Sequence, residues 1–268
     1  MEYFKLNNNL LIPKVGIGTN TFGKVNHEYM GEINFNTNEL ISAFSHGYRL
    51  IDTAISYRNE AVIGKAIKES NLKREDFFIT SKIGTKIEYV KDLKTIKDYL
   101  NKSINNIGSY VDLYLIHHPS TDDLNLKLWE ILESYYEKGL FKAIGVSNFT
   151  QEQIDYLIEH SKIIPAVNQI EINSNKFDFN LINYLIKNNI YPTAWSPLHL
   201  NKDSKDFLTK VGEKYNKTWA QVYLRFLTQL NIIVIPKSHH EKRQLENISI
   251  FDFSLNDEEI NVIKQHFI

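Results

Sequence analysis

The sequence predicts an α/β fold, a (β/α)8 TIM barrel preceded by an N-terminal β-hairpin, and three observations support this. Short apolar segments alternate with amphipathic ones along nearly all of the 268 residues. Eight of the apolar segments have the composition of buried strands, and eight strand–helix units need about 250 residues. Polar or titratable residues follow seven of these strands, at the end where active sites of this fold gather.

The expected strands are short runs rich in β-branched and aromatic residues. They cover residues 15–17, 48–51, 77–81, 110–116, 141–146, 166–170, 190–194 and 232–235. The expected helices cover residues 37–45, 60–69, 92–107, 126–138, 150–160, 179–187 and 218–229, and a final helix begins near residue 255. In 92–107, five apolar residues recur at steps of three and four, as one buried helix face requires. They are Leu93, Ile96, Leu100, Ile104 and Ile107.

Two short segments before the first barrel strand, 3–6 and 10–12, flank Asn7-Asn8-Asn9. This pattern predicts a hairpin that caps the barrel floor. A doubly wound sheet is the competing architecture, but Gly16-Ile17-Gly18-Thr19 lacks the third glycine of the dinucleotide-binding turn. No linker, repeat or low-complexity segment interrupts the chain, so we expect residues 1–268 to form one domain.

Composition excludes several classes of function. Lys and Arg number 31 and Asp and Glu 32, so charge gives no support to a nucleic-acid or anionic-membrane partner. The absence of cysteine excludes disulfides, thiolate metal sites and thiol chemistry. No run approaches the roughly 18 apolar residues of a membrane span, and residues 1–9 lack the pattern of a signal peptide. We therefore expect a soluble, cytoplasmic protein.

Three successive strands are followed by groups suited to the reduction of a carbonyl. Asp52 ends the strand at 48–51, Tyr57 follows in a loop, and Lys82 and His117 end the next two strands. Hydride delivery builds negative charge on the carbonyl oxygen, which needs a proton or a positive field at once. Tyr57 is a proton donor whose pKa Lys82 would lower, with Asp52 holding Lys82 charged. The alternative to a catalytic role is that Asp52 caps a turn, or that His117 is a structural histidine.

Six segments, taken in order, carry a resemblance to a known family. They are Gly16-Ile17-Gly18-Thr19, Gly47-Tyr48-Arg49-Leu50-Ile51-Asp52-Thr53-Ala54 with Tyr57 and Asn59-Glu60, Asp112-Leu113-Tyr114-Leu115-Ile116-His117 with Pro119, Ile144-Gly145-Val146-Ser147-Asn148-Phe149, Asn168-Gln169-Ile170-Glu171, and Ile235-Pro236-Lys237-Ser238. Nearly the whole chain resembles the aldo-keto reductase superfamily, in its short microbial form. The resemblance implies NADPH-dependent reduction of an aldehyde or ketone without metal or flavin. It assigns the catalytic tetrad to Asp52, Tyr57, Lys82 and His117, with Tyr57 as general acid.

The resemblance also assigns the cofactor-binding residues. At the nicotinamide end they are Gly18, Thr19, Asn20, Asp52, Ser147, Asn148, Gln169, Trp195, Ser196 and Leu198. Ser147, Asn148 and Gln169 would hydrogen-bond the carboxamide. Trp195 would stack on the nicotinamide. The alternative is that Trp195 is a core aromatic residue of the seventh strand. Ser196 and Leu198 would line the pyrophosphate path.

The segment from 237 to 247 resembles the site of the adenosine 2′-phosphate. Lys237, Ser238 and Arg243 would bind the phosphate, because two cations and a hydroxyl suit a dianion. Glu246 and Asn247 would contact the adenine. A solvated basic helix start is the alternative. His239-His240 could suggest a metal pair, but adjacent histidines on a helix diverge and no carboxylate partner is evident. We therefore expect no metal site.

The chain departs from the family pattern around the substrate. Gly84 stands where many relatives have a bulky aromatic, His118 replaces a frequent Trp, and Arg58 replaces a frequent Gly. The chain also ends soon after its final helix, without a long C-terminal loop. These features predict an open, polar pocket and leave the substrate unnamed. His118 could be either a pocket wall or structural.

Two other functions compete with a carbonyl reductase. One is an NADPH-binding regulatory or auxiliary protein, which the intact tetrad argues against. The other is an unrelated barrel isomerase or lyase, which would not explain the nicotinamide and 2′-phosphate residues together. We expect a monomer whose partner is a small-molecule carbonyl, with no nucleic acid and no membrane.

Overall fold

A computed structural model describes residues 1–267 as an eight-stranded parallel barrel with a separate two-stranded hairpin. The strands are β1 (Tyr3–Lys5), β2 (Leu11–Pro13), β3 (Gly16–Gly18), β4 (Leu50–Asp52), β5 (Phe78–Ile83), β6 (Val111–Ile116), β7 (Phe141–Ser147), β8 (Val167–Glu171), β9 (Tyr191–Trp195) and β10 (Ile233–Val234). The α-helices are α1 (Asn38–Ser45), α2 (Glu60–Glu69), α3 (Ile87–Val90), α4 (Leu93–Ile107), α5 (Asp122–Glu137), α6 (Gln151–His160), α7 (Phe179–Lys187), α8 (Lys202–Glu213), α9 (Trp219–Gln229), α10 (Glu241–Ile248) and α11 (Asp257–His266). Three 3-10 turns are η1 (Val25–His27), η2 (Ile55–Tyr57) and η3 (Arg74–Asp76).

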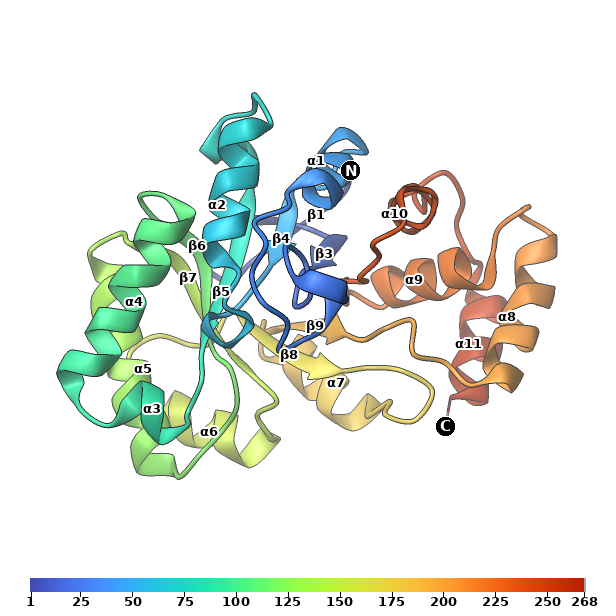
Figure 1. Cartoon of the computed structure of the whole chain (residues 1–268). Coiled ribbons are helices and arrows are strands. Elements are labelled where there is room, and N and C mark those ends of the chain that lie inside the picture. The colour runs from blue at the N-terminus through green and yellow to red at the C-terminus, as the bar shows by residue number, and fades with distance from the viewer. Residues whose placement is uncertain (268) are drawn as a thin grey trace.

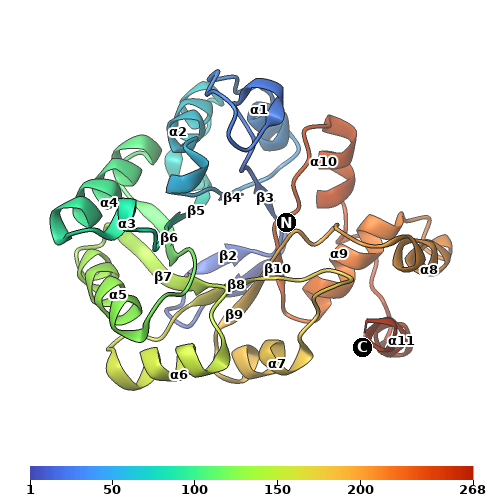
Figure 2. The ribbon, with the colours of Figure 1, turned by 60° about the horizontal axis from the view of Figure 1, so that its bottom comes forward.

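The eight parallel strands follow one another in chain order from β3 to β10. The ring closes between the first and last strands, where a parallel bridge joins Val15 and Val234 and the Val234 amide donates to the Lys14 carbonyl at 3.0 Å. Figure 1 shows the barrel from the side, and Figure 2 shows the strands ringed by helices. The predicted barrel is therefore confirmed.

The hairpin of β1 and β2 also matches the prediction. The two strands pair antiparallel with Phe4 opposite Ile12. These two side chains belong to an apolar cluster that includes the barrel-strand residues Leu50, Phe78 and Leu113. A second, larger cluster joins the strands to the surrounding helices. The hairpin therefore covers one end of the barrel interior, and the other end remains for a site.

Most predicted boundaries lie within two residues of the observed ones. α5 is the main exception, because it begins four residues earlier than expected, after Thr121, whose side chain accepts from the Leu124 amide. α3, α8 and α10 were not among the predicted helices. α8 packs beside α9 outside the ring of helices, with α11 next to it (Figure 2). Among the described residues, no helix has the length and apolarity to cross a membrane.

Candidate active site

A cavity of about 400 Å³ opens at the carboxyl ends of the barrel strands. All four predicted tetrad positions meet there, since Asp52, Tyr57 and His117 line the cavity and Lys82 lies directly behind them. The other lining residues come from the ends of several strands and from the segments that follow them. They are Gly18, Thr19, Asn20, Tyr29, Ser56, Gly84, Thr85, Lys86, Tyr89, His118, Ser147, Asn148, Gln169, Trp195, Ser196, Ile235 and Lys237.

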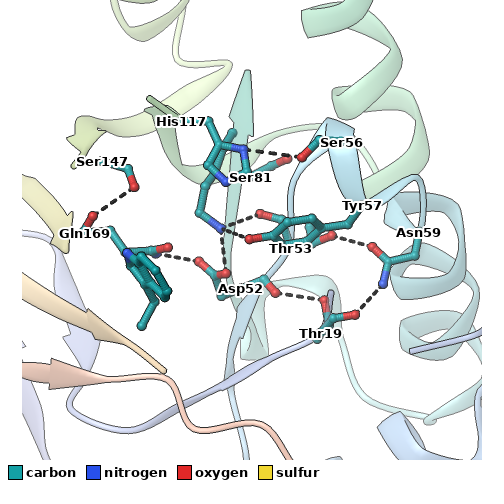
Figure 3. Close-up of polar contacts among 12 residues, drawn as sticks. Thr19, Asp52, Thr53, Ser56, Tyr57, Asn59, Ser81, His117, Ser147 and Gln169 are labelled. Atoms are coloured by element: carbon teal, nitrogen blue, oxygen red, sulfur yellow. Dashed lines mark hydrogen bonds and ion pairs between the residues drawn. The ribbon is translucent and has the colours of Figure 1, made fainter. Parts of the chain in front are cut away.

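The centre of the site is an ion pair at the end of β4 and in β5. Lys82 Nζ lies 2.6 Å from Asp52 Oδ1 and donates to Tyr57 Oη at 3.4 Å. Its third contact is the Thr53 carbonyl, at 3.0 Å. The second oxygen of Asp52 accepts from Gln169 Nε2 at 2.7 Å. In Figure 3, Asp52 lies between Gln169 and Tyr57. The Lys82 side chain is fully buried and that of Asp52 is 4% exposed, so the arrangement is shielded from water.

The local fold around β4 holds Tyr57 in place. Tyr57 ends η2, and the left-handed backbone of Arg58 (φ 60°) follows it. Asn59 is fully buried, accepts from Thr53 Oγ1 at 2.8 Å and donates to the Thr19 carbonyl at 2.7 Å. Thr19 in turn donates to the Asp52 carbonyl. Asn59 therefore ties the turn that contains Tyr57 to the ends of the first two barrel strands, β3 and β4 (Figure 3). We had assigned Asn59 no role, although it lies within the family motif.

Electrostatics at Tyr57 differ from the sequence-based expectation. Burial, aided by the Asp52 charge, raises the pKa of Tyr57 well above its usual value of 10.0. We had expected Lys82 to lower it, but burial also lowers the pKa of Lys82, against the opposing effect of Asp52. Tyr57 therefore keeps its proton at neutral pH. A protonated phenol is the form that a proton donor needs.

His117 is a neutral imidazole over the whole physiological range. Burial, with a smaller effect of the Lys82 charge, lowers its pKa to about 2. Its ring lies edge-on to Tyr57 with centroids 5.6 Å apart, and its Nδ1 lies 3.4 Å from Ser56 Oγ. The ring also stacks on His118 at 4.5 Å. His118 lines the cavity, which favours the pocket-wall alternative for this residue.

The residues predicted to bind the nicotinamide form one chain of hydrogen bonds. Ser147 Oγ donates to the Gln169 carbonyl at 2.8 Å, and Asn148 Nδ2 donates to Ser147 Oγ at 3.0 Å. Trp195 Nε1 donates to Asn148 Oδ1 at 3.0 Å. Asn148 and Ser196 both have left-handed backbone, with φ of 61° and 51°. Strained backbone of this kind gathers at ligand sites, where the surrounding structure holds it.

A second hollow lies beside the first, between α9 and the loop before α10. It is lined by His27, Leu198, Lys205, Trp219, Ala220, Lys237, Ser238, His239, His240, Arg243, Glu246 and Asn247. Six of the predicted cofactor residues are in this set. Lys237 lines both hollows, and its Nζ donates to Asn20 Oδ1 at 3.0 Å. The two hollows therefore meet at Lys237, and both are lined by cofactor-binding candidates, as an elongated dinucleotide requires.

Two expectations about the pocket need correction. The space beside Gly84 is not open, because a Cβ added there would lie 2.9 Å from the Tyr89 ring. Tyr89 and Tyr29 both line the cavity, so aromatic walls come from segments that we had not considered. Arg58 donates to the Gly31 carbonyl at 2.9 Å and so holds the segment after η1 rather than opening the pocket.

The family model of the aldo/keto reductase family matches residues 14–268. The chain is 37% identical to glyoxal reductase of Bacillus subtilis over 97% of this chain and 90% of that protein. It is 34% identical to morphine 6-dehydrogenase of Pseudomonas putida over 95% and 88% of the two chains.

Solved structures agree. An aldo-keto reductase from a Medee basin deep-sea metagenome library matches with a TM-score of 0.87 and 38% identity, over 98% of this chain and 94% of that one. A Bombyx mori aldo-keto reductase in complex with NADP matches with a TM-score of 0.86 and 31% identity, over 99% and 92%.

The barrel and the polar network at its strand ends define an oxidoreductase. The chain belongs to the aldo/keto reductase family, and it is an NADPH-dependent enzyme of that family.

Proposed function

We propose that this enzyme reduces a small, polar aldehyde or ketone to an alcohol, with Tyr57 as the proton donor. The observation that carries the proposal is the position of Lys82 Nζ, 2.6 Å from Asp52 and 3.4 Å from Tyr57 Oη in a buried site. This geometry places a cation against the phenol that must give up its proton. The similarity to relatives named as reductases and dehydrogenases supports the same reaction class.

The residues present fit NADPH. Ser147, Asn148 and Gln169 offer amide and hydroxyl groups at the cavity, and Trp195 adds an aromatic wall. Lys237, Ser238 and Arg243 meet at the second hollow, where two cations and a hydroxyl suit the 2′-phosphate. When bound, NADPH supplies the hydride.

Protein groups supply the remaining chemistry. Negative charge that develops on the carbonyl oxygen is met by the Tyr57 hydroxyl, whose proton moves to that oxygen. Lys82 stabilises the phenolate that is left, which lowers the barrier for this transfer. Asp52 holds Lys82 in place through an ion pair and is itself held by Gln169. His117, neutral and beside Tyr57, orients the carbonyl by hydrogen bonding.

Cavity size and lining point to a small, polar substrate. The cavity of about 400 Å³ must hold both the nicotinamide and the carbonyl compound. Polar groups of Ser56, Lys86 and His118 line it together with Tyr29 and Tyr89. A short dicarbonyl or hydroxyaldehyde fits this combination, and the similarity to a glyoxal reductase agrees with it.

NADPH consumption with glyoxal or another short, reactive aldehyde tests the proposal. Wild-type protein should oxidise NADPH only when the aldehyde is present. Tyr57→Phe keeps the ring and the fold, so the rate should fall by roughly 10²–10⁴-fold while NADPH binding persists. Near-normal turnover by Tyr57→Phe would overturn the mechanism. No turnover by the wild type on any aldehyde, with NADPH still bound, would favour the auxiliary-protein alternative.

A further inference from the structure

Three side chains from distant parts of the sequence meet beside the second hollow. His27 ends η1, Glu39 lies in the first turn of α1, and His239 lies in the loop after β10. His27 Nε2 lies 2.7 Å from Glu39 Oε1, and His239 Nδ1 lies 2.7 Å from Glu39 Oε2. The two imidazole rings stack with centroids 3.8 Å apart. One carboxylate therefore faces two imidazole nitrogens on the same side of the molecule.

We propose that these residues form a binding site for a divalent transition metal of the zinc class, with His27 Nε2, the Glu39 carboxylate and His239 Nδ1 as ligands. Two imidazoles and a carboxylate are a common zinc-binding set. The three donor atoms lie within 4.8 Å of one another, and tetrahedral zinc ligands lie ~3.3 Å apart at ordinary bond lengths. Small side-chain movements therefore suffice to bind the ion.

The surroundings of His239 match those of a metal ligand. A ligating histidine usually uses its other ring nitrogen to hydrogen-bond a neighbour, which fixes the tautomer. His239 Nε2 lies 2.7 Å from Thr21 Oγ1, and its ring stacks on Phe22 at 4.6 Å. Without an ion, Nδ1–H donates to Glu39 Oε2 at 2.7 Å. Loss of that proton, with Nε2–H then donating to Thr21, would leave the Nδ1 lone pair for an ion. The cation nearest in the chain, Lys237, donates from Nζ to Thr21 Oγ1 at 3.2 Å and to Asn20 Oδ1 at 3.0 Å.

Backbone geometry and access agree with this assignment. Asn26 and His27 are consecutive left-handed residues, with φ of 54° and 55°. This uncommon conformation for side-chain-bearing residues places the His27 ring over that of His239. The His27 side chain is 50% exposed, and both histidines line the second hollow. The fourth coordination position can therefore hold water or an anion from solvent.

Such a site would be separate from the catalytic network and would join the two edges of the barrel seam. Its ligands come from the segment after β3 and from the segment after β10, the two strands that close the ring. Because an ion that binds only the folded chain stabilises it by mass action, zinc should raise the melting temperature. Local sequence gives no sign of this site, because its carboxylate, Glu39, lies 200 residues from His239 in the chain.

Isothermal titration of EDTA-treated full-length protein with Zn²⁺ tests the proposal. Wild type should bind one equivalent, and Co²⁺ should give the visible absorption of a four-coordinate site. His27→Gln and His239→Gln each remove a ligand, so affinity should fall by more than the roughly 10–100-fold typical of an outer-shell partner. Thr21→Val should weaken binding within that smaller range.

His46→Gln is the matched control, because His46 faces a single carboxylate, Glu241, at 3.4 Å. This variant should bind Zn²⁺ as the wild type does. Undiminished affinity of His27→Gln, or loss of binding by His46→Gln, would overturn the site. So would the absence of saturable 1:1 binding in the wild type. Circular dichroism and the urea midpoint without added metal show that each variant is folded, and His27→Gln, at a half-exposed position, covers the case in which His239→Gln is not.

Discussion

The two ends of the proposed cofactor-binding region are built differently. At the catalytic end, Asp52, Lys82 and Gln169 are buried, and Asp52 accepts hydrogen bonds from both Lys82 and Gln169. At the phosphate end, Lys237 and Arg243 are exposed. In the described part of the chain, Arg243 makes no ion pair within 4.0 Å. The first region is preorganised, whereas the second still has cations available for a ligand.

This difference follows from what each region must do. A reacting oxygen gains most from groups that are already oriented, because no reorganisation is then needed as charge develops. A phosphate brings its own charge and can order flexible cations around it, with part of the binding energy spent on that ordering. Changes in the buried network should therefore reduce turnover and stability, and changes in the exposed one should reduce cofactor affinity.

The largest expected effect concerns Tyr57 and Lys82 as one unit. Lys82→Met should lower aldehyde reduction by about 10²–10⁴-fold, as Tyr57→Phe should. The double variant should be little slower than either single one, because residues that act together are strongly non-additive. Steady-state kinetics of the four proteins, with NADPH binding as the control, measure this. Multiplicative losses would show that the two side chains act independently.

Asp52→Asn tests the cost of an unpaired charge in the buried region. Lys82, fully buried, would lose the anion with which it pairs at 2.6 Å, so the free energy of unfolding should fall by about 3 kcal/mol. Arg243→Ala, in the exposed region, should change it by less than about 0.5 kcal/mol. Urea denaturation of the three proteins gives both values. Equal stabilities would show that the ion pair contributes little to folding.

Arg243→Ala should instead weaken the cofactor. Loss of one charge-assisted contact costs about 1.5–3 kcal/mol, so the Michaelis constant for NADPH should rise roughly 10–100-fold while that for NADH changes little. Lys242→Ala is the matched control, because Lys242 is an exposed neighbour that does not line the hollow. Equal damage to both cofactors would place the 2′-phosphate elsewhere.

The smallest expected effect is that of pH on the reduction. His117, with a pKa near 2, is neutral throughout, and the raised pKa of Tyr57 keeps the phenol protonated. Neither group changes its charge between pH 5 and 8, so kcat for reduction should be flat over that range. A kcat profile measured in overlapping buffers checks this. A step near pH 6.5 that disappears in His117→Gln would contradict the neutral assignment.

The alternation of strands and helices and the four tetrad positions were predictable from the sequence. Periodicity reveals which segments are strands, and in a barrel the carboxyl ends of all strands converge. Asp52, Lys82 and His117 end successive strands, so their meeting follows from the fold class alone. The resemblance added the cofactor positions, and the structure brings those positions to two adjoining hollows.

Tertiary structure alone decided what depends on contacts between loops or on the depth of burial. No periodicity links His27, Glu39 and His239, because each lies in a segment whose path is determined by its packing against the others. Tyr89 beside Gly84 is a similar case. The direction of the Tyr57 pKa shift also needed the structure, because burial is its largest cause and the depth of burial depends on how the chain packs.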